Sequence, residues 1–133
     1  MNTPFIYPVR VYWEDTDAGG VVYYANYLKF MERARTEWLR NLGFEQQALR
    51  DTHGIVFVVR RVEIDYLAPA RLDDLLTLTT CLSTTTRTCL TVTQEIAADT
   101  PLTQARVQLV CVDPARFKPV KIPARLLEKL SLP

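Results

Sequence analysis

The sequence predicts an α+β fold in which one long central helix is wrapped by a five-stranded antiparallel sheet. Two observations carry this prediction. Apolar residues recur at helical spacing over residues 24–42, whereas most of the chain after residue 55 alternates between apolar and polar residues, as strands do. The strands follow one another through short connections, which favours antiparallel pairing without crossover helices.

The first strand and the long helix come first along the chain. A strand is expected near the N-terminus, where alternate residues are apolar: Tyr7, Val9, Val11 and Trp13. The helix presents one apolar stripe, formed by Tyr27, Met31, Ala34, Trp38 and Leu42 and widened by Leu28 and Phe30. Gly43 suits the position that ends a helix, and a shorter helix is expected over residues 45–52.

Four more strands and a short helix are expected in the rest of the chain. In the second strand, one face carries Val56, Val58, Val62, Ile64 and Tyr66, with Arg60 as an interruption. Turns at 83–88, 98–101 and 113–119 predict a meander, followed by a helix over 123–130. The length of 133 residues suits one domain over residues 1–133. One helix leaves part of such a sheet uncovered, which favours an oligomer.

The composition argues against several classes of protein. Sixteen basic and fifteen acidic residues leave a net charge of +1, so no nucleic-acid footprint is indicated. We expect neither a membrane span nor a secretory signal. One histidine, His53, and two serines without a Gly-x-Ser-x-Gly motif argue against a serine hydrolase. Three widely spaced cysteines indicate reduced cytosolic thiols rather than a zinc site.

Chemistry is therefore expected from carboxylates and backbone groups, which meet where the first strand joins the long helix. A helix start offers unpaired N–H groups, and Gly19 and Gly20 let a ligand approach the backbone. Asp17 could then act as a base or nucleophile opposite an oxyanion hole. A calcium loop is not favoured, because Gly19 and Asn26 stand at its fifth and twelfth positions, where such a loop needs Asp or Asn and Glu. Spacing alone also fits a solvated loop in which Asp15 and Asp17 are turn and cap residues.

The same segment resembles a known family. It reads EDTDAGGVVYYANY over residues 14–27, which looks like the signature of hotdog-fold acyl-CoA thioesterases. Further matches are FMERAR at 30–35, VVR at 58–60, APARLDD at 68–74 and VDP at 112–114. Together they resemble the Tol-Pal-associated branch of the 4-hydroxybenzoyl-CoA thioesterase family over nearly the whole chain. The resemblance implies a single hotdog domain.

The resemblance also implies roles for individual residues. Asp17 becomes the catalytic carboxylate, which attacks the thioester carbonyl or activates a water, and the backbone N–H of Tyr24 polarises that carbonyl. The branch usually has a histidine at the position of Tyr24 and a tyrosine at that of Trp13. These two departures bear on the pH profile and the acyl preference. Trp13, Gly20 and Val21 are expected to contact the substrate.

Three more residues are candidate substrate contacts, each with a structural alternative. Asn26 also suits a role in holding the loop, or simply an early helical position. Arg60 either reaches the ligand or pairs with a carboxylate such as Glu32 or Asp65. Arg87 either binds the coenzyme A phosphates or lies in a solvated hairpin.

We therefore expect a cytoplasmic hydrolase that converts an acyl-CoA thioester into a free carboxylic acid and coenzyme A. No metal or cofactor is expected beyond the coenzyme A of the substrate. The resemblance implies a homo-oligomer, a dimer and commonly a tetramer, with the site between two subunits. Two alternatives remain: a hotdog dehydratase that would use His53, and a non-catalytic module that binds acyl carrier protein or phospholipid-synthesis enzymes at the envelope.

Overall fold

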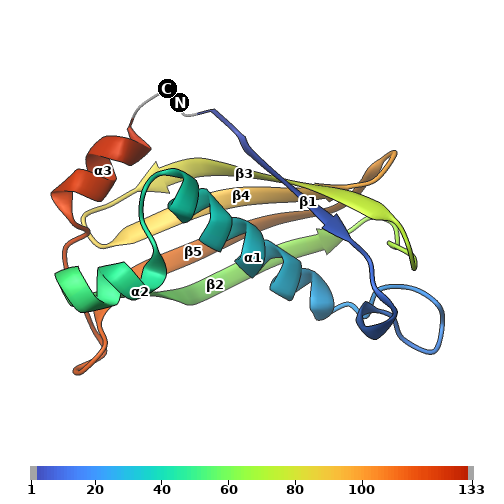
Figure 1. The fold of residues 1–133 in the computed structure, drawn as a ribbon, viewed down its shortest axis with the longest axis horizontal. Coiled ribbons are helices and arrows are strands. Elements are labelled where there is room, and N and C mark those ends of the chain that lie inside the picture. The colour runs from blue at the N-terminus through green and yellow to red at the C-terminus, as the bar shows by residue number, and fades with distance from the viewer. Residues whose placement is uncertain (1–2, 132–133) are drawn as a thin grey trace.

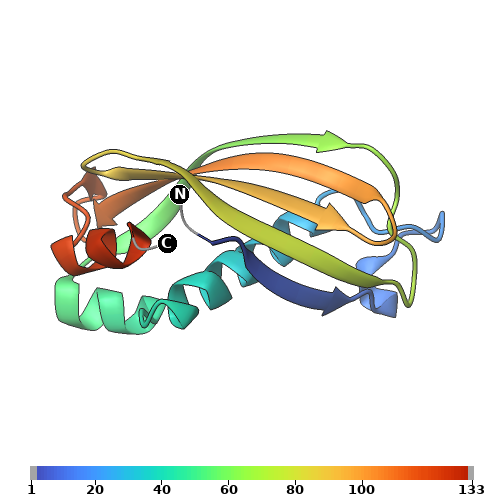
Figure 2. The same ribbon diagram turned by 90° about the horizontal axis from the view of Figure 1, so that it is seen from above.

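A long helix lies across one curved antiparallel sheet in the computed structural model, which describes residues 3–131 (Figures 1 and 2). The strands are β1 (Phe5–Arg10), β2 (Val56–Tyr66), β3 (Leu75–Thr85), β4 (Cys89–Ala97), β5 (Pro101–Asp113) and β6 (Lys118–Pro119). The helices are α1 (Asn26–Asn41), α2 (Gln46–Ala48) and α3 (Ala124–Leu130), with a 3-10 turn at Trp13–Asp15 and a π-helical turn at Leu49–His53. The predicted α+β architecture is confirmed, and the short β6 is an additional strand.

The strand order is β1-β3-β4-β5-β2, with β6 paired to β5. The predicted meander holds from β3 to β5 but is wrong for β2, which pairs with β5 and not with β3. Residues 67–74 carry the chain from β2, at one edge, to β3, which lies beside β1 near the other edge, and they form backbone hydrogen bonds to Leu102 and Val11 and a bond to the Tyr27 hydroxyl. Within residues 3–131, the outer side of β2 therefore has no partner strand.

A bulge at Arg60 changes which residues of β2 face the helix. The register with β5 shifts by one residue at this point. Because side chains alternate with a period of two, the extra residue reverses the faces of the first half of the strand. Phe57 and Val59 pair with Cys111 and Leu109, which lie on the same face of β5 as the partners of Val62 and Ile64. Phe57 and Val59 therefore share the helix-facing side with the second half of the strand. The predicted placing of Val56 and Val58 on that face is wrong.

Helix α1 starts at Asn26, two residues later than predicted, and ends through a glycine cap. Gly43 has a φ of 95°, its N–H donates to Arg40 O at 2.9 Å, and the N–H of Phe44 donates to Leu39 O at 2.9 Å. This pair of bonds is the Schellman arrangement, in which glycine tolerates the left-handed backbone that a side chain would strain. The predicted role of Gly43 is confirmed.

The buried face of α1 is close to the predicted stripe and packs mainly on β3 and β1. Its buried residues are Tyr27, Phe30, Met31, Ala34, Arg35, Trp38 and Leu39. Leu28 is 39% exposed, so its predicted place in the core is wrong. Leu42 is only half-buried, because it already belongs to the helix cap.

Arg35 is a buried cation between α1 and the sheet. Its guanidinium donates to Gln94 Oε1 at 3.0 Å, and Gln94 Nε2 donates to Thr80 Oγ1 and to Met31 O, each at 3.0 Å. Desolvation lowers the pKa of Arg35, and the nearby Glu32 carboxylate opposes this shift. The closed network satisfies the polar atoms that burial removes from water, and it ties α1 to β3 and β4.

Three other boundaries differ from the prediction. Strand β1 ends at Arg10, so Trp13 lies in the 3-10 turn and not in a strand. The helix expected over residues 45–52 is divided between α2 and the π-helical turn, which extends to His53. Helix α3 begins at Ala124, after Pro123 in the cap position. No helix within the described residues is long and apolar enough to cross a membrane.

Candidate active site

The loop between β1 and α1 lies at the end of the molecule opposite α2 and α3 (Figure 1). Thr16 and Val22 form an isolated bridge, and the N–H of Asp17 donates to Val21 O at 2.9 Å. The N–H of Gly20 donates to Asp17 O at 3.0 Å, which closes a tight turn. Gly20 has a φ of 81°, a conformation that glycine adopts without strain. The glycine therefore lets Asp17 stand at the start of a small, ordered hairpin.

The Asp17 side chain is exposed, and only one of its oxygens is held. Oδ1 accepts a hydrogen bond from the N–H of Gly19 at 2.8 Å. Oδ2 accepts no hydrogen bond from any residue between 3 and 131. One oxygen thus fixes the carboxylate while the other is free to meet a ligand, an arrangement that suits a base or a nucleophile.

Gly19→Ala tests how tightly this carboxylate must be placed. A Cβ at position 19 would lie 3.2 Å from Asp17 Oδ1, which would displace the carboxylate by a few tenths of an ångström. We expect kcat to fall about tenfold, because small misplacements of a reacting group slow catalysis steeply. The thermal midpoint should move little, since Gly19 is exposed and its φ is not in the left-handed region. Turnover equal to wild type would show that this placement is not critical.

Tyr24 lies two residues before α1, so its predicted position inside the helix is wrong. It occupies a turn closed by the N–H of Asn26, which donates to Tyr23 O at 2.8 Å. The N–H of Tyr24 has no acceptor among residues 3–131. This N–H stands beside the positive end of the α1 dipole, where a negatively charged oxygen is stabilised. The local geometry therefore suits an oxyanion donor.

A group of tyrosines surrounds this backbone. The rings of Tyr23 and Tyr24 have centroids 4.9 Å apart, and Tyr66 contacts the rings of Tyr24 at 6.3 Å and Tyr27 at 5.6 Å. The Tyr66 hydroxyl donates to Tyr24 O at 2.9 Å. Desolvation, with Tyr24 and Tyr27 nearby, raises the pKa of Tyr66, so the hydroxyl keeps its proton. The residue thus links the end of β2 to the candidate oxyanion donor.

Tyr66 is not among the site residues predicted from the sequence. The sequence pattern indicates only that it is one of the alternating apolar positions of a strand. The sequence holds no local signal for the contact, because the hydroxyl reaches a carbonyl 42 residues away. A half-exposed aromatic residue at the last position of an edge strand is a weak hint at most.

Four other predicted residues lie in or beside the loop. Gly20 and Val21 belong to the hairpin itself, and Val21 also bridges to Arg71. Trp13 is 78% exposed in the 3-10 turn, so its indole is available to a ligand or a second subunit. The side-chain amide of Asn26 donates to Asp15 Oδ1 at 2.8 Å, which favours the loop-holding role over a substrate contact.

The two predicted arginines lie elsewhere. Arg60 is exposed in the β2 bulge, and within the described chain it forms no ion pair with Glu32 or Asp65. Arg87 lies in the β3–β4 hairpin, at the α3 end of the sheet (Figure 1). A full-length strand separates that hairpin from Asp17. The chain therefore does not bring Arg87 to its own loop, and a contact with the same substrate would need a second copy.

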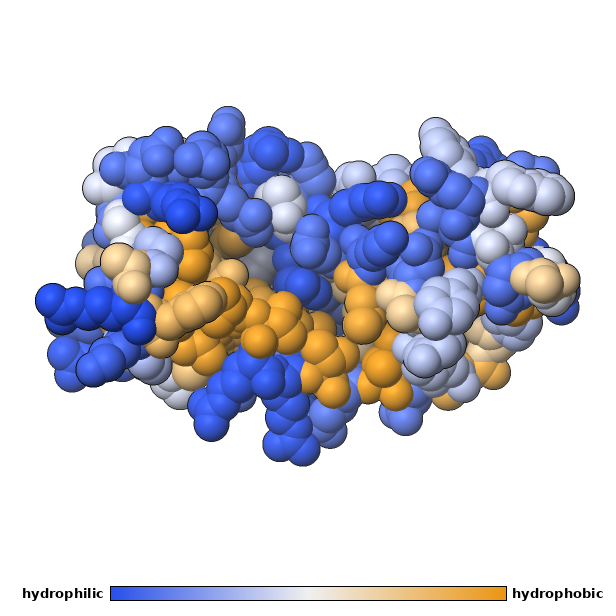
Figure 3. Space-filling view, turned by 90° about the horizontal axis from the view of Figure 1, so that it is seen from below, coloured by the Kyte–Doolittle hydropathy of each residue, from blue (hydrophilic) through white to orange (hydrophobic). Residues whose placement is uncertain are grey.

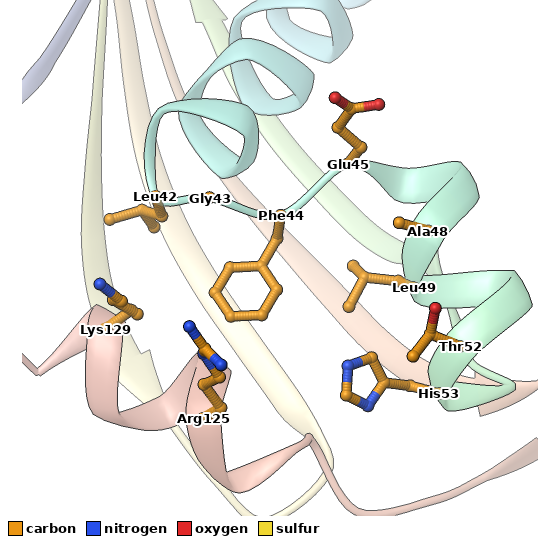
Figure 4. Close-up of a pocket in the computed structure, with 10 residues that line it drawn as sticks. All are labelled: Leu42, Gly43, Phe44, Glu45, Ala48, Leu49, Thr52, His53, Arg125 and Lys129. Atoms are coloured by element: carbon orange, nitrogen blue, oxygen red, sulfur yellow. The ribbon is translucent and has the colours of Figure 1, made fainter.

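His53 lines a separate cavity of about 260 Å³ at that far end (Figure 4). The cavity lies between the end of α1, the π-helical turn and α3, with Phe44 at its centre, His53 on one side and Arg125 and Lys129 on the other. Within one chain His53 is therefore remote from Asp17, and a dehydratase that used both residues would need a second copy to bring them together. Burial raises the pKa of the Cys111 thiol to about 11, so this thiol is a poor nucleophile.

Helix, sheet and loop together define a hotdog fold that carries a candidate carboxylate site at the start of its central helix. The chain matches the thioesterase-like superfamily over residues 11–130, and it therefore belongs to that family. The predicted hotdog thioesterase family and fold are confirmed, and so is the prediction of a thioester hydrolase, whereas the Tol-Pal-associated branch stays a prediction.

Relatives of known name agree with this assignment. The acyl-CoA thioester hydrolase YbgC of Escherichia coli O6:H1 is 52% identical over 98% of this chain and 99% of its own length. The acyl-CoA thioesterase YbgC of Haemophilus influenzae is 48% identical over 92% of this chain and 91% of its own. Among solved structures, a probable thioesterase from Bartonella henselae superposes with a TM-score of 0.88 at 37% identity, covering 91% of this chain and all of that one (100%).

Proposed function

We propose that this protein hydrolyses acyl-CoA thioesters to a free carboxylic acid and coenzyme A. The names of the E. coli and H. influenzae relatives support the substrate class. The observation that carries the mechanism is the pairing, in one loop, of an exposed carboxylate at Asp17 with an unpaired N–H at Tyr24. Within residues 3–131, Asp17 Oδ2 and the N–H of Tyr24 have no hydrogen-bond partner, so both are free to meet a ligand.

In the proposed mechanism the thioester carbonyl oxygen accepts a hydrogen bond from the N–H of Tyr24, which stabilises the negative charge that develops there. The Asp17 carboxylate either attacks the carbonyl carbon or removes a proton from the attacking water. If Asp17 is the base, the C–S bond breaks as the tetrahedral intermediate collapses, and the coenzyme A thiolate takes up the proton that Asp17 removed from the water. If Asp17 is the nucleophile, the C–S bond breaks to leave a mixed anhydride on Asp17, the thiolate takes a proton from solvent, and a water then hydrolyses the anhydride to release the free acid and restore the carboxylate. Gly20 and Val21 lie close to the reacting group, while the exposed rings of Trp13 and Tyr66 offer an apolar surface to the acyl chain.

A panel of short, aromatic and long acyl-CoA esters tests this function through release of free thiol. We expect turnover of at least one class and no requirement for added metal. No turnover across the panel, together with tight binding of acyl carrier protein, would instead favour the non-catalytic alternative. The panel also defines the acyl preference, on which Trp13 and Tyr24 are expected to act.

The proposed assembly is a homodimer through β2. The outer side of this strand is unpaired within residues 3–131, and an uncovered edge strand readily pairs with another chain. Val59 is 48% exposed and Val62 37%, on the helix-facing side of the same edge. Figure 3 shows apolar side chains gathered in a band across this side of the molecule. A second copy pairing here would cover the band and continue the sheet.

Val59→Glu combined with Val62→Glu tests the dimer. Two carboxylates brought into a paired edge lose solvation, so we expect the dimer Kd to rise at least about a hundredfold. Sedimentation equilibrium measures the change. Ile6→Glu is the control, because Ile6 is 54% exposed on β1, at the opposite edge of the sheet from β2. An unchanged dimer in the double variant would exclude this edge as the interface.

The cellular setting belongs to the same proposal. A tetramer, a cytoplasmic location and an association with the Tol-Pal system rest on the resemblance to the Tol-Pal-associated branch. The three free thiols of Cys81, Cys89 and Cys111 are compatible with a reducing compartment. In an oligomer, Arg60 and Arg87 of one copy remain candidates to contact coenzyme A bound at another.

A further inference from the structure

Asp15 is a buried carboxylate inside the candidate active-site loop. It is 8% exposed, whereas Asp17, two residues further along, is exposed. Both side-chain oxygens are occupied: Oδ2 accepts the N–H of Tyr12 at 2.8 Å, and Oδ1 accepts the Asn26 amide at 2.8 Å. The backbone carbonyl of Asp15 accepts the N–H of Tyr23 at 3.0 Å. An acid with no free oxygen and little access to solvent is badly placed for chemistry of its own.

These contacts tie together the two halves of the site. Through Tyr12, Asp15 holds the 3-10 turn that leads directly to Asp17. Through Tyr23 and Asn26, it holds the residues on either side of the Tyr24 turn. One side chain and its own backbone therefore set where the carboxylate stands relative to the N–H at the start of α1.

We propose that Asp15 is a positioning residue for thioester hydrolysis, which acts by clamping the Asp17 segment to the N-terminus of α1 through Asn26. The proposal rests on the function proposed above. It assigns Asn26 to the clamp and leaves Asp17 and Tyr24 as the groups that meet the substrate. It goes beyond a turn or cap role because it makes catalysis, and not only stability, depend on the contact between Asp15 and Asn26.

The charge of Asp15 is not what the clamp requires. A negative charge near the helix start is favourable for the helix, but it opposes the negative charge that the Tyr24 N–H would stabilise during the reaction. Only the two hydrogen bonds can therefore serve catalysis. Both hydrogen bonds can be kept when the negative charge is moved from position 15 to position 26. An amide at position 15 can accept from the N–H of Tyr12 with its oxygen and donate with its nitrogen to a carboxylate at position 26.

The test is a double-mutant cycle of Asp15→Asn, Asn26→Asp and the two combined. In Asn26→Asp two carboxylates meet, which breaks the clamp. In Asp15→Asn the Asn26 amide can turn over and accept from the new NH₂ group with its oxygen, so this variant keeps both hydrogen bonds and removes only the charge. We expect Asn26→Asp to lower kcat about tenfold or more with KM nearly unchanged, because the reacting groups lose alignment while the acyl surface remains. The kcat of Asp15→Asn should stay within about threefold of wild type. The combined variant restores both bonds, and its kcat should return to within about threefold of wild type.

Two further variants separate positioning from folding. Asn26→Ala removes one bond without bringing like charges together, so it should fold and still show the loss in kcat. Thr80→Val removes a buried hydrogen bond from Gln94 in the sheet, and it should lower the thermal midpoint while kcat stays at the wild-type value. A kcat that merely followed the thermal midpoint across all these variants would overturn the clamp.

The outcomes also distinguish the clamp from the function on which it rests. Wild-type turnover with an unaffected Asn26→Asp variant would overturn the clamp alone. A combined variant no faster than its slower parent would do the same. Absence of turnover in the wild type would overturn the proposed function, and the clamp with it.

Discussion

Asp17→Asn is expected to lower kcat for acyl-CoA hydrolysis by about a thousandfold, with little change in KM or in the thermal midpoint. The amide has nearly the shape of the carboxylate and its oxygen can still accept the N–H of Gly19, which holds Asp17 Oδ1 at 2.8 Å. It has no basic oxygen to attack a carbonyl or to take a proton from water. The measurement is the initial rate of thiol release on the best ester of the panel, beside a thermal denaturation curve.

Asp99→Asn is the matched control for this substitution. Asp99 is an exposed aspartate in the turn between β4 and β5, so its change removes the same charge from the surface without touching the loop. We expect its rate to equal that of the wild type. Full activity in Asp17→Asn would remove the carboxylate from the mechanism and return Asp17 to the turn role that its spacing also allows.

The sequence could predict those features of the fold that depend on residues only a few positions apart. The apolar stripe of α1 repeats every three or four residues, and Gly43 ends the helix through its own backbone conformation. Pairing between distant strands leaves no comparable pattern in the sequence. Strand β2 pairs with β5 and not with the next strand along the chain, and the alternation of β2 itself does not reveal the bulge at Arg60. Arg35 is buried only because Gln94, on a distant strand, accepts its hydrogen bond.

The candidate site likewise contains residues that are close in the sequence and residues that meet only in the folded chain. Asp17 and the Tyr24 backbone could be predicted because carboxylate, glycines and helix start lie within one short segment with a family signature. Tyr66 could not, because it joins them only when β2 ends beside the loop. The clamp of Asp15 lies inside the segment, yet its spacing is equally that of a turn. Its burial, which distinguishes the two roles, becomes visible only in three dimensions.

Tyr24→Pro is expected to lower kcat by about a hundredfold to a thousandfold, the loss typical when one oxyanion donor is removed. Tyr24 is the second residue of the turn closed by Asn26 and Tyr23, a position that proline favours in β-turns. The N–H that proline lacks donates to no residue between 3 and 131, so the fold loses no hydrogen bond from it. Circular dichroism and the thermal midpoint should therefore stay close to wild type while thiol release falls.

Tyr24→Phe and Tyr24→Ala identify the group responsible. Both keep the backbone N–H; the first removes only the hydroxyl, and the second removes the ring that contacts Tyr23 and Tyr66. If the N–H is the oxyanion donor, kcat should be near wild type in the Phe variant, modestly reduced in the Ala variant and lowest in the Pro variant. Equal losses in Ala and Pro would assign the effect to the ring. The usual histidine of the branch would then be replaced here by an aromatic wall, and the oxyanion donor would have to be sought elsewhere in the loop.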